Sequence, residues 1–190
     1  VHHPIIVKTN QVLMKMLKHV LSVTIGCAIL LAVPALGQDA PKLSDAEVAS
    51  VAVVANQIDI NYADIAKQKS KNADVLKFAE TMANDHKAVI SQAAALAKKL
   101  GVTPADNAVS QKLLADAEQT KKKLQATSKK DFDKAYIDNE VAYHKAVIEA
   151  VENLLIPETD NAELKALLQN VVPALKAHLA HAQMVQKMFN

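Results

Sequence analysis

The chain has little of what turn-rich, disulfide-bonded or nucleic-acid-binding proteins need. Its 190 residues include three glycines, one cysteine and no tryptophan. So few glycines exclude a β fold with many tight turns, and a single cysteine excludes a disulfide framework within the chain. All 22 basic residues are lysines. Without arginine the chain lacks the planar fork that pairs with phosphate and guanine, so we expect no nucleic-acid partner.

Alanine, leucine, lysine and valine dominate instead, and all but valine are strong helix formers. The composition therefore predicts an all-α protein, and the length suits one domain with a short appendage. The first 37 residues contain three lysines and no acid, which leaves 19 lysines against 20 acids in the remainder. A nearly neutral domain offers no large basic field to a polyanionic partner.

Residues 1–37 are predicted to be an N-terminal extension and a cleavable secretory signal. Lys15 and Lys18 precede an apolar run over residues 20–33, and Ala35-Leu36-Gly37 has the small-x-small pattern of a cleavage site. Cleavage starts the mature protein at Gln38 and leaves residues 38–43 as a short linker. This predicts a periplasmic or extracellular protein with no stable membrane insertion after cleavage.

Two alternatives exist for this segment. The apolar run is near the lower length limit of a membrane anchor, although Pro34 and the small residues after it favour cleavage. Cys27 would be the acylated residue of a lipoprotein, but the apolar run continues past it. The start of translation is left open among Val1, Met14 and Met16, because residues 1–13 precede any methionine.

Residues 44–190 are predicted to form one helical domain. Ser44-Asp45-Ala46-Glu47 is a capping-box pattern that starts a helix over residues 44–70. A second helix runs from about residue 72 to Gly101, the only glycine after the signal, which suits a left-handed C-cap. Thr103-Pro104 then begins a short helix that extends to about residue 125.

A third helix begins at Ser128, where the spacing to Asp131 suggests another capping box, and reaches Leu155 before Pro157 stops it. A fourth begins at residue 159 or 160 and lasts to about Met188, with a kink at Pro173. The first and second helices, and the third and fourth, are joined tightly, whereas some 27 residues separate the second from the third. Two hairpins with such a connection predict a ferritin-like four-helix bundle whose long crossover carries a short extra helix.

Polar residues interrupt the apolar seams of these helices near their centres. The seam positions are filled mainly by valine, leucine, isoleucine and alanine, but they also hold His86, Glu140, His144 and His178. Asp59 borders the seam of the first helix close to its middle. Because antiparallel helices of similar length bring their centres together, these five side chains are expected at one level of the interior.

A buried layer of this kind needs partners, and two solutions exist. One is a single divalent transition metal bound by His86, His144 and His178 with Glu140 or Asp59, and the other is a hydrogen-bonded layer that only fixes helix register. A proton-responsive layer is a third alternative. The methionines Met82, Met184 and Met188 are predicted to pack in the core, because they do not cluster with the histidines.

Three stretches resemble one known family: Phe78-Ala79-Glu80-Thr81-Met82-Ala83-Asn84-Asp85-His86; Phe132-Asp133-Lys134-Ala135-Tyr136 followed by His144; and Pro173-Ala174-Leu175-Lys176-Ala177-His178-Leu179. They are similar to the bacterial ferritin-like family catalogued as domain of unknown function number 4142, over nearly all of residues 44–189. The resemblance implies an exported four-helix protein and supplies no activity. It places the family's Asp-His, later His and Pro-x-x-x-x-His on Asp85, His86, His144, Pro173 and His178.

The chain departs from the patterns expected of such proteins at two points. Asp59 stands in the first helix where the family pattern has Glu, so the reach of its shorter side chain is open. Ferritins and their di-iron relatives use Glu-x-x-His pairs, but the residues three before the histidines are Ala83, Val141 and Leu175. A mononuclear zinc or copper site is therefore favoured over a di-iron centre.

Two functions from different classes follow. One is a periplasmic metal-binding protein for storage, buffering or sensing. The other is a non-catalytic envelope stress or interaction protein with a structural histidine layer, whose partner and oligomeric state the sequence does not identify. An enzyme is the least favoured, because the chain has no nucleophile with a positioned base and no glycine-rich phosphate loop.

Overall fold

The computed structural model describes residues 42–190, so the predicted signal and the first part of the linker lie outside the described residues. Every regular element in the described range is helical, as the composition predicts. The five long helices are α2 (Asp45–Lys69), α3 (Ala73–Leu100), α4 (Ala108–Ala126), α5 (Lys129–Ala150) and α7 (Ala162–Gln186). Short elements are the π-helix η2 (Val151–Leu155), α6 (Ile156–Glu158) and the 3-10 helix η3 (Lys187–Phe189).

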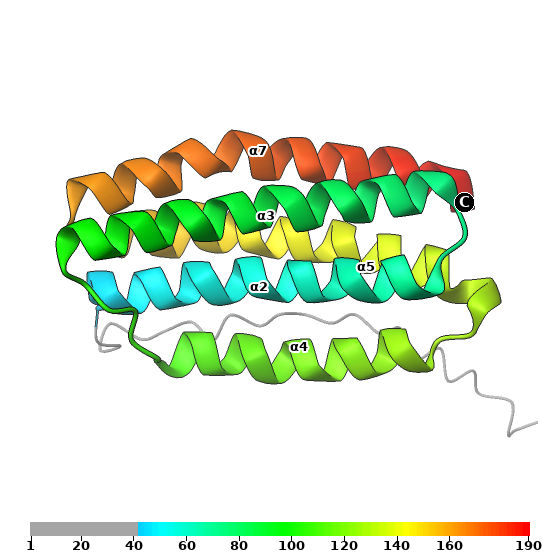
Figure 1. Cartoon of the computed structure of the whole chain (residues 1–190), viewed down its shortest axis with the longest axis horizontal. Coiled ribbons are helices and arrows are strands. Elements are labelled where there is room, and N and C mark those ends of the chain that lie inside the picture. The colour runs from blue at the N-terminus through cyan, green and yellow to red at the C-terminus, as the bar shows by residue number, and fades with distance from the viewer. Residues whose placement is uncertain (1–41) are drawn as a thin grey trace, which may run out of the picture. The chain divides into compact units, whose positions relative to one another are not determined.

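The helices pack as two antiparallel pairs, α2 with α3 and α5 with α7 (Figure 1). Helix α3 also packs on α7, and α2 packs on α5, so the pairs face one another. Helix α4 runs back along the length of α2 and carries the chain from the end of α3 to the start of α5. Between residues 42 and 190, no helix combines the length and apolarity that a membrane crossing requires.

Three predicted helix ends are confirmed by their cap geometry. The Ser44 side chain accepts a hydrogen bond from the Glu47 backbone N–H, and the Glu47 carboxylate accepts one from the Ser44 backbone N–H. Gly101 ends α3 with φ 64°, a left-handed conformation that costs a residue with a Cβ roughly 1 kcal/mol. At the start of α5 the Ser128 hydroxyl accepts from the Asp131 N–H, as predicted. The capping box is incomplete, because the Asp131 carboxylate accepts from the Ser128 hydroxyl and not from the Ser128 backbone N–H.

Two other predicted starts are wrong, because contacts with the beginning of α2 hold the preceding residues outside the helix. Helix α4 begins after Asn107 instead of Thr103-Pro104, since the Ala105 N–H donates to the Ala46 carbonyl and the Asn107 amide donates to Glu47 O. Helix α7 begins after Asn161 instead of residue 159 or 160. There the Asp45 carboxylate accepts from the backbone N–H groups of residues 160 and 161.

Neither Pro157 nor Pro173 ends the helical stretch in which it lies. Past the predicted end at Leu155 the chain stays helical to Glu158, through a π turn in which the Ile156 N–H donates to Val151 O. Shifting the bond register just before Pro157 moves the preceding carbonyls away from the proline ring. Helix α7 is continuous through Pro173, as predicted, and bends along its length in Figure 1.

The core consists of two apolar clusters that lie towards opposite ends of the helices. The first cluster is built around Phe78, Met82, Phe132, Tyr136 and Ala182. The second is built around Val48, Val51, Val151, Leu155 and Leu168. In α2, α5 and α7 the two clusters are separated by a short stretch of helix. His144 and His178 lie in that gap, whereas Asp59 and Glu140 lie at the edge of the first cluster, beside Ile58 and Val141.

The prediction that all three methionines pack in the core is wrong for two of them. Met82 is fully buried in the first cluster. Met184, near the end of α7, and Met188, in η3, are 61% and 54% exposed. The core side of α7 at this end is occupied by Ala182 and Val185, so Met184 lies on its solvent side.

Lys69, the last residue of α2, binds the C-terminal end of α4, the crossover helix. Its Nζ donates to the backbone oxygens of Leu124, Gln125 and Thr127, and it lies 5.2 Å from the centroid of the Phe132 ring. The last carbonyls of a helix have no N–H partner within the helix and carry partial negative charge. A lysine ammonium that binds three carbonyls at this end therefore stabilises α4 and fixes it to α2.

We expect Lys69→Met to destabilise the protein by about 1–2 kcal/mol, because methionine keeps the apolar stem but leaves these carbonyls unpaired. Hydrogen exchange in the last turn of α4, beside urea unfolding, measures the effect. Lys67→Met is the matched control, since Lys67 pairs with Asp64 on its own helix. Equal exchange rates in the two variants would contradict this role of Lys69.

Candidate functional site

The structure brings all five predicted site residues together between the two apolar clusters. Asp59 comes from α2, His86 from α3, Glu140 and His144 from α5, and His178 from α7. All five are buried, from 0% exposure for Asp59 and Glu140 to 7% for His178. We call these five residues the polar layer. Asp59 reaches it in spite of its short side chain.

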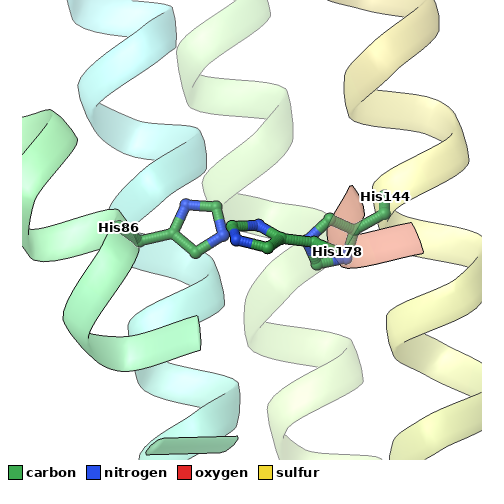
Figure 2. A group of neighbouring side chains, drawn as sticks. All are labelled: His86, His144 and His178. Atoms are coloured by element: carbon green, nitrogen blue, oxygen red, sulfur yellow. The ribbon is translucent and has the colours of Figure 1, made fainter. Parts of the chain in front are cut away.

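The three imidazole rings point towards one another (Figure 2). Their centroids are 5.3 Å apart for His86 and His178, 5.5 Å for His144 and His178, and 5.8 Å for His86 and His144. One nitrogen from each ring lies within 4.8 Å of the corresponding nitrogens of the other two. Three rings from three helices therefore present nitrogen atoms to one small volume.

Each ring is fixed by a hydrogen bond on one of its two nitrogens. His86 Nδ1 lies 2.7 Å from Asn56 Oδ1, and His144 Nδ1 lies 3.0 Å from the main-chain oxygen of Glu140. His178 Nε2 lies 2.9 Å from Asp85 Oδ2. These oxygens act as acceptors, so in neutral rings the proton lies on these nitrogens. The Asn56 amide is oriented by its own bond from Nδ2 to the Ala52 carbonyl.

The other nitrogens are consequently bare acceptors. His86 Nε2, His144 Nε2 and His178 Nδ1 are buried and have no hydrogen-bond partner among the described residues. A neutral imidazole that donates through one nitrogen and offers a lone pair from the other is the form in which histidine binds metal ions. The backbone and side-chain partners thus select the tautomers that a metal site needs.

The two carboxyl groups present the same feature. Both oxygens of Asp59 and both of Glu140 are buried without a hydrogen-bond donor in the described part of the chain. Asp59 Oδ2 lies 3.5 Å from His86 Nε2 and 3.5 Å from His144 Nε2. Glu140 Oε2 lies 3.5 Å from His144 Nδ1. Lone pairs of a carboxylate and two imidazoles that face one another repel unless a proton or a cation lies between them.

Burial sets the charge state of the layer. Burial, followed by the nearby His144 and His178, lowers the pKa of His86 to about 3, and burial lowers that of His144 to about 4. Burial raises the pKa of Asp59 to about 7. Burial, and then the charge of Asp59, raises the pKa of Glu140 well above its usual range. Near neutral pH His86 and His144 are therefore neutral, and their contacts with Asp59 are not ion pairs.

The donor set fits one divalent transition-metal ion. Three imidazole nitrogens and a carboxylate oxygen are ligands that zinc and copper accept. A tetrahedral ion roughly 2.0–2.1 Å from its ligands holds them roughly 3.3 Å apart, so small movements of the rings complete the geometry. One divalent cation, two ionised carboxylates and three neutral imidazoles sum to zero charge. A second divalent ion would leave uncompensated positive charge in an apolar surrounding, so this balance favours a single ion.

Asn56 is the one partner in this site that the sequence analysis did not identify. Its signal is weak but present, because Asn56 lies three residues before Asp59 and therefore on the same face of α2. Asp85 is the second partner, next to His86 in the chain. Its contact is with His178 on the neighbouring helix.

The pH dependence of stability offers a test of the buried carboxyls. We expect the free energy of unfolding of the metal-free protein to fall as the pH rises from about 7 to about 8.5. In this range His86 and His144 are neutral in the folded state and mostly neutral in the unfolded state. Asp59 and Glu140 are ionised when unfolded but keep protons when folded, so rising pH favours unfolding by up to about 1.4 kcal/mol per pH unit for each protonated carboxyl.

The contribution of Asp59 levels off above its folded pKa of about 7, while that of Glu140 continues. Urea unfolding at several pH values, with a chelator present, measures the slope. Below about pH 7 His86 and His144 act in the opposite direction. Their pKa values are lower in the folded state, so the unfolded state binds more protons and the stability falls as the pH falls. A flat profile between neutral and mildly alkaline pH would show that the carboxyls are not held in this protonated state.

Comparison with known proteins identifies one family. Residues 32–185 match the family described as "Domain of unknown function (DUF4142)". No curated protein and no solved structure matches the chain. The matched segment contains all five residues of the polar layer and also Asn56 and Asp85. Because the match extends over most of its length, the chain belongs to the DUF4142 family.

Proposed function

We propose that this protein binds one divalent transition-metal ion in the polar layer. His86, His144 and His178 supply three nitrogens, and Asp59 supplies the oxygen nearest to two of them. Glu140 lies beside this set and balances the charge of the ion. The observation that carries the proposal is the convergence of three bare imidazole nitrogens and two carboxyl groups, all buried and all without a hydrogen-bond donor.

The proposed architecture is a ferritin-like four-helix bundle. Two antiparallel hairpins, α2–α3 and α5–α7, with α4 as a crossover between them, support it. The Glu-x-x-His pairs of di-iron proteins are missing from the chain, and the neutral charge balance favours one ion. Zinc or copper is therefore the metal that this donor set suits best.

We further propose that the protein is exported and holds the metal for storage, buffering or sensing in a bacterial envelope. Export is supported by the signal pattern in residues 1–37. Retention of the ion, instead of turnover of a substrate, is supported by the burial of every ligand in the layer. A catalytic metal keeps a ligand position that substrate or water can reach from solvent.

Metal titration tests the proposal. The purified protein is stripped with a chelator and then titrated with Zn²⁺, Cu²⁺ and Mg²⁺ under native mass spectrometry. We expect one equivalent of zinc or copper, and no magnesium, because magnesium prefers oxygen ligands and keeps its waters. If the protein takes up none of these ions and its unfolding temperature is insensitive to them, the layer is structural and the envelope interaction function replaces the metal-binding one.

A further inference from the structure

The histidines of the polar layer differ in the residues that hold them, and His178 is held by the most exposed side chain. Asn56, which holds His86, is partly buried, and the Glu140 main chain holds His144 within α5. Asp85, which holds His178, lies on α3 with its side chain 52% exposed. Its hydrogen bond therefore joins α3 to α7 at the surface, between solvent and the polar layer.

Exposure decreases in order from Asp85 into the interior. The His178 side chain is 9% exposed, that of His86 is 5%, that of His144 is 1% and that of Asp59 is 0%. Neighbouring members of this series are in contact through their rings or through the 3.5 Å approaches to Asp59. Metal-binding groups thus form a continuous path from solvent at the α3–α7 side to the closed carboxyl pair at the α2–α5 side.

The α3 side is also the less tightly packed side of the layer. The buried residues of α3 run from Val75 to His86, and none from residue 87 to residue 100 is fully buried. Segments with few fully buried side chains open at lower free energy than the core. A small movement of α3 at Asp85 therefore costs less than opening the layer through α2 or α5, whose residues Asp59 and Glu140 are fully buried.

We propose that Asp85 and His178 form the port of the metal site, the point at which the ion enters from solvent. This inference rests on the proposed function. The Asp85 carboxylate attracts the incoming cation and is its first contact. The same carboxylate accepts a hydrogen bond from His178 Nε2–H and so keeps Nδ1 bare and turned towards His86 and His144. Asp85 is thus a positioning residue for His178 as well as the outermost group of the path.

Three variants separate these two roles. Asp85→Ala removes both the acceptor and the charge, whereas Asp85→Asn keeps an acceptor oxygen and removes the charge. Asp138→Ala is the matched control, because Asp138 on α5 is also half-exposed and also bonds to α7, but through Gln186 and not a histidine. Each protein is measured by ¹⁵N NMR of its histidines without metal, by zinc competition, and by stopped-flow uptake of Co²⁺.

We expect Asp85→Ala to lose the single His178 tautomer and to bind zinc roughly 10–100-fold more weakly, the usual effect of losing an outer partner of a metal-binding histidine. Asp85→Asn keeps the tautomer and most of the affinity but takes up Co²⁺ several-fold more slowly. Asp138→Ala matches the wild type in all three measurements. The tautomer measurement needs no metal, so it tests the positioning role independently of the proposed function.

The outcomes distinguish the two proposals. If the wild type binds one ion and Asp85→Ala matches it in tautomer and affinity, the positioning role is wrong while the metal-binding function stands. If Asp85→Asn takes up Co²⁺ at the wild-type rate, the carboxylate does not recruit the ion. A wild type that binds no metal overturns the port together with the site.

Discussion

Replacing His144 by leucine is expected to abolish metal binding while leaving the helices intact. His144 belongs to both groups of converging ligands, one with His86 and His178 and the other with Asp59 and Glu140. Its ring is 1% exposed, and leucine fills most of its volume without offering a lone pair. Two remaining imidazoles make a much weaker site, so the affinity for zinc should fall by at least roughly a hundredfold.

Stability separates a binding site from a structural layer in this variant. If the ring binds metal, the metal-free variant is as stable as the metal-free wild type or more stable, because a desolvated imidazole has been replaced by an apolar group. Circular dichroism and urea unfolding, beside zinc competition, measure both properties. His181→Leu is the control, because His181 lies one turn further along α7 and packs edge-on against Phe78, away from the layer.

A large loss of stability in His144→Leu without any change in metal binding would contradict the account. It would mean that the ring contributes hydrogen bonds that fix the packing of α5 against its neighbours. The single bond found for its side chain, to the main chain of Glu140 in its own helix, gives little reason to expect this.

The second large effect is expected from Asp59→Asn, which should stabilise the metal-free protein and weaken its response to metal. The Asp59 carboxyl is fully buried, has no donor and has a pKa of about 7. Asparagine has almost the same shape and cannot ionise, so the variant avoids the cost of that buried charge. At about pH 8 we expect a gain on the order of 2 kcal/mol in the free energy of unfolding.

Bound metal is expected to reverse the order of stability of the wild type and Asp59→Asn. A wild-type protein at a free-ion concentration about 100 times its Kd gains about 2.7 kcal/mol of stability, whereas the variant has lost the oxygen ligand and gains much less. Thermal unfolding with and without zinc measures both gains. Asp64→Asn, an exposed acid in the same helix, should change neither. If Asp59→Asn is destabilised without metal, the carboxyl has a structural partner that this account does not include.

The helical fold was predictable because its signals are local. Apolar spacing marks the long helices, and caps such as Ser44 and Gly101 act within a few residues of themselves. The starts of α4 and α7 were not predictable, because backbone bonds to Ala46 and Asp45 hold the preceding segments in place. Those contacts join residues more than 50 positions apart, and no spacing along the chain indicates them.

The polar layer was predictable for a related reason. A histidine at a seam position must face the interior, and helices of similar length place their central residues at one level. Asn56 is different, because it holds a ring on another helix, and Asp85 likewise contacts His178 on α7 although it is adjacent to His86 in the chain. Which nitrogen each partner contacts depends on how the helices are rotated about their axes. Periodicity shows which face of a helix points inward. It does not fix the rotation of the helix closely enough to identify a single hydrogen-bond partner.

The measurement that tests the central claim most directly is anomalous X-ray diffraction from crystals of the cobalt- or zinc-loaded protein. The account predicts one strong peak inside the domain, roughly 2.0–2.2 Å from His86 Nε2, His144 Nε2 and His178 Nδ1, with an Asp59 oxygen beside it. A peak confined to surface residues such as His181, or an interior in which the three rings hydrogen-bond with one another around no ion, would contradict it.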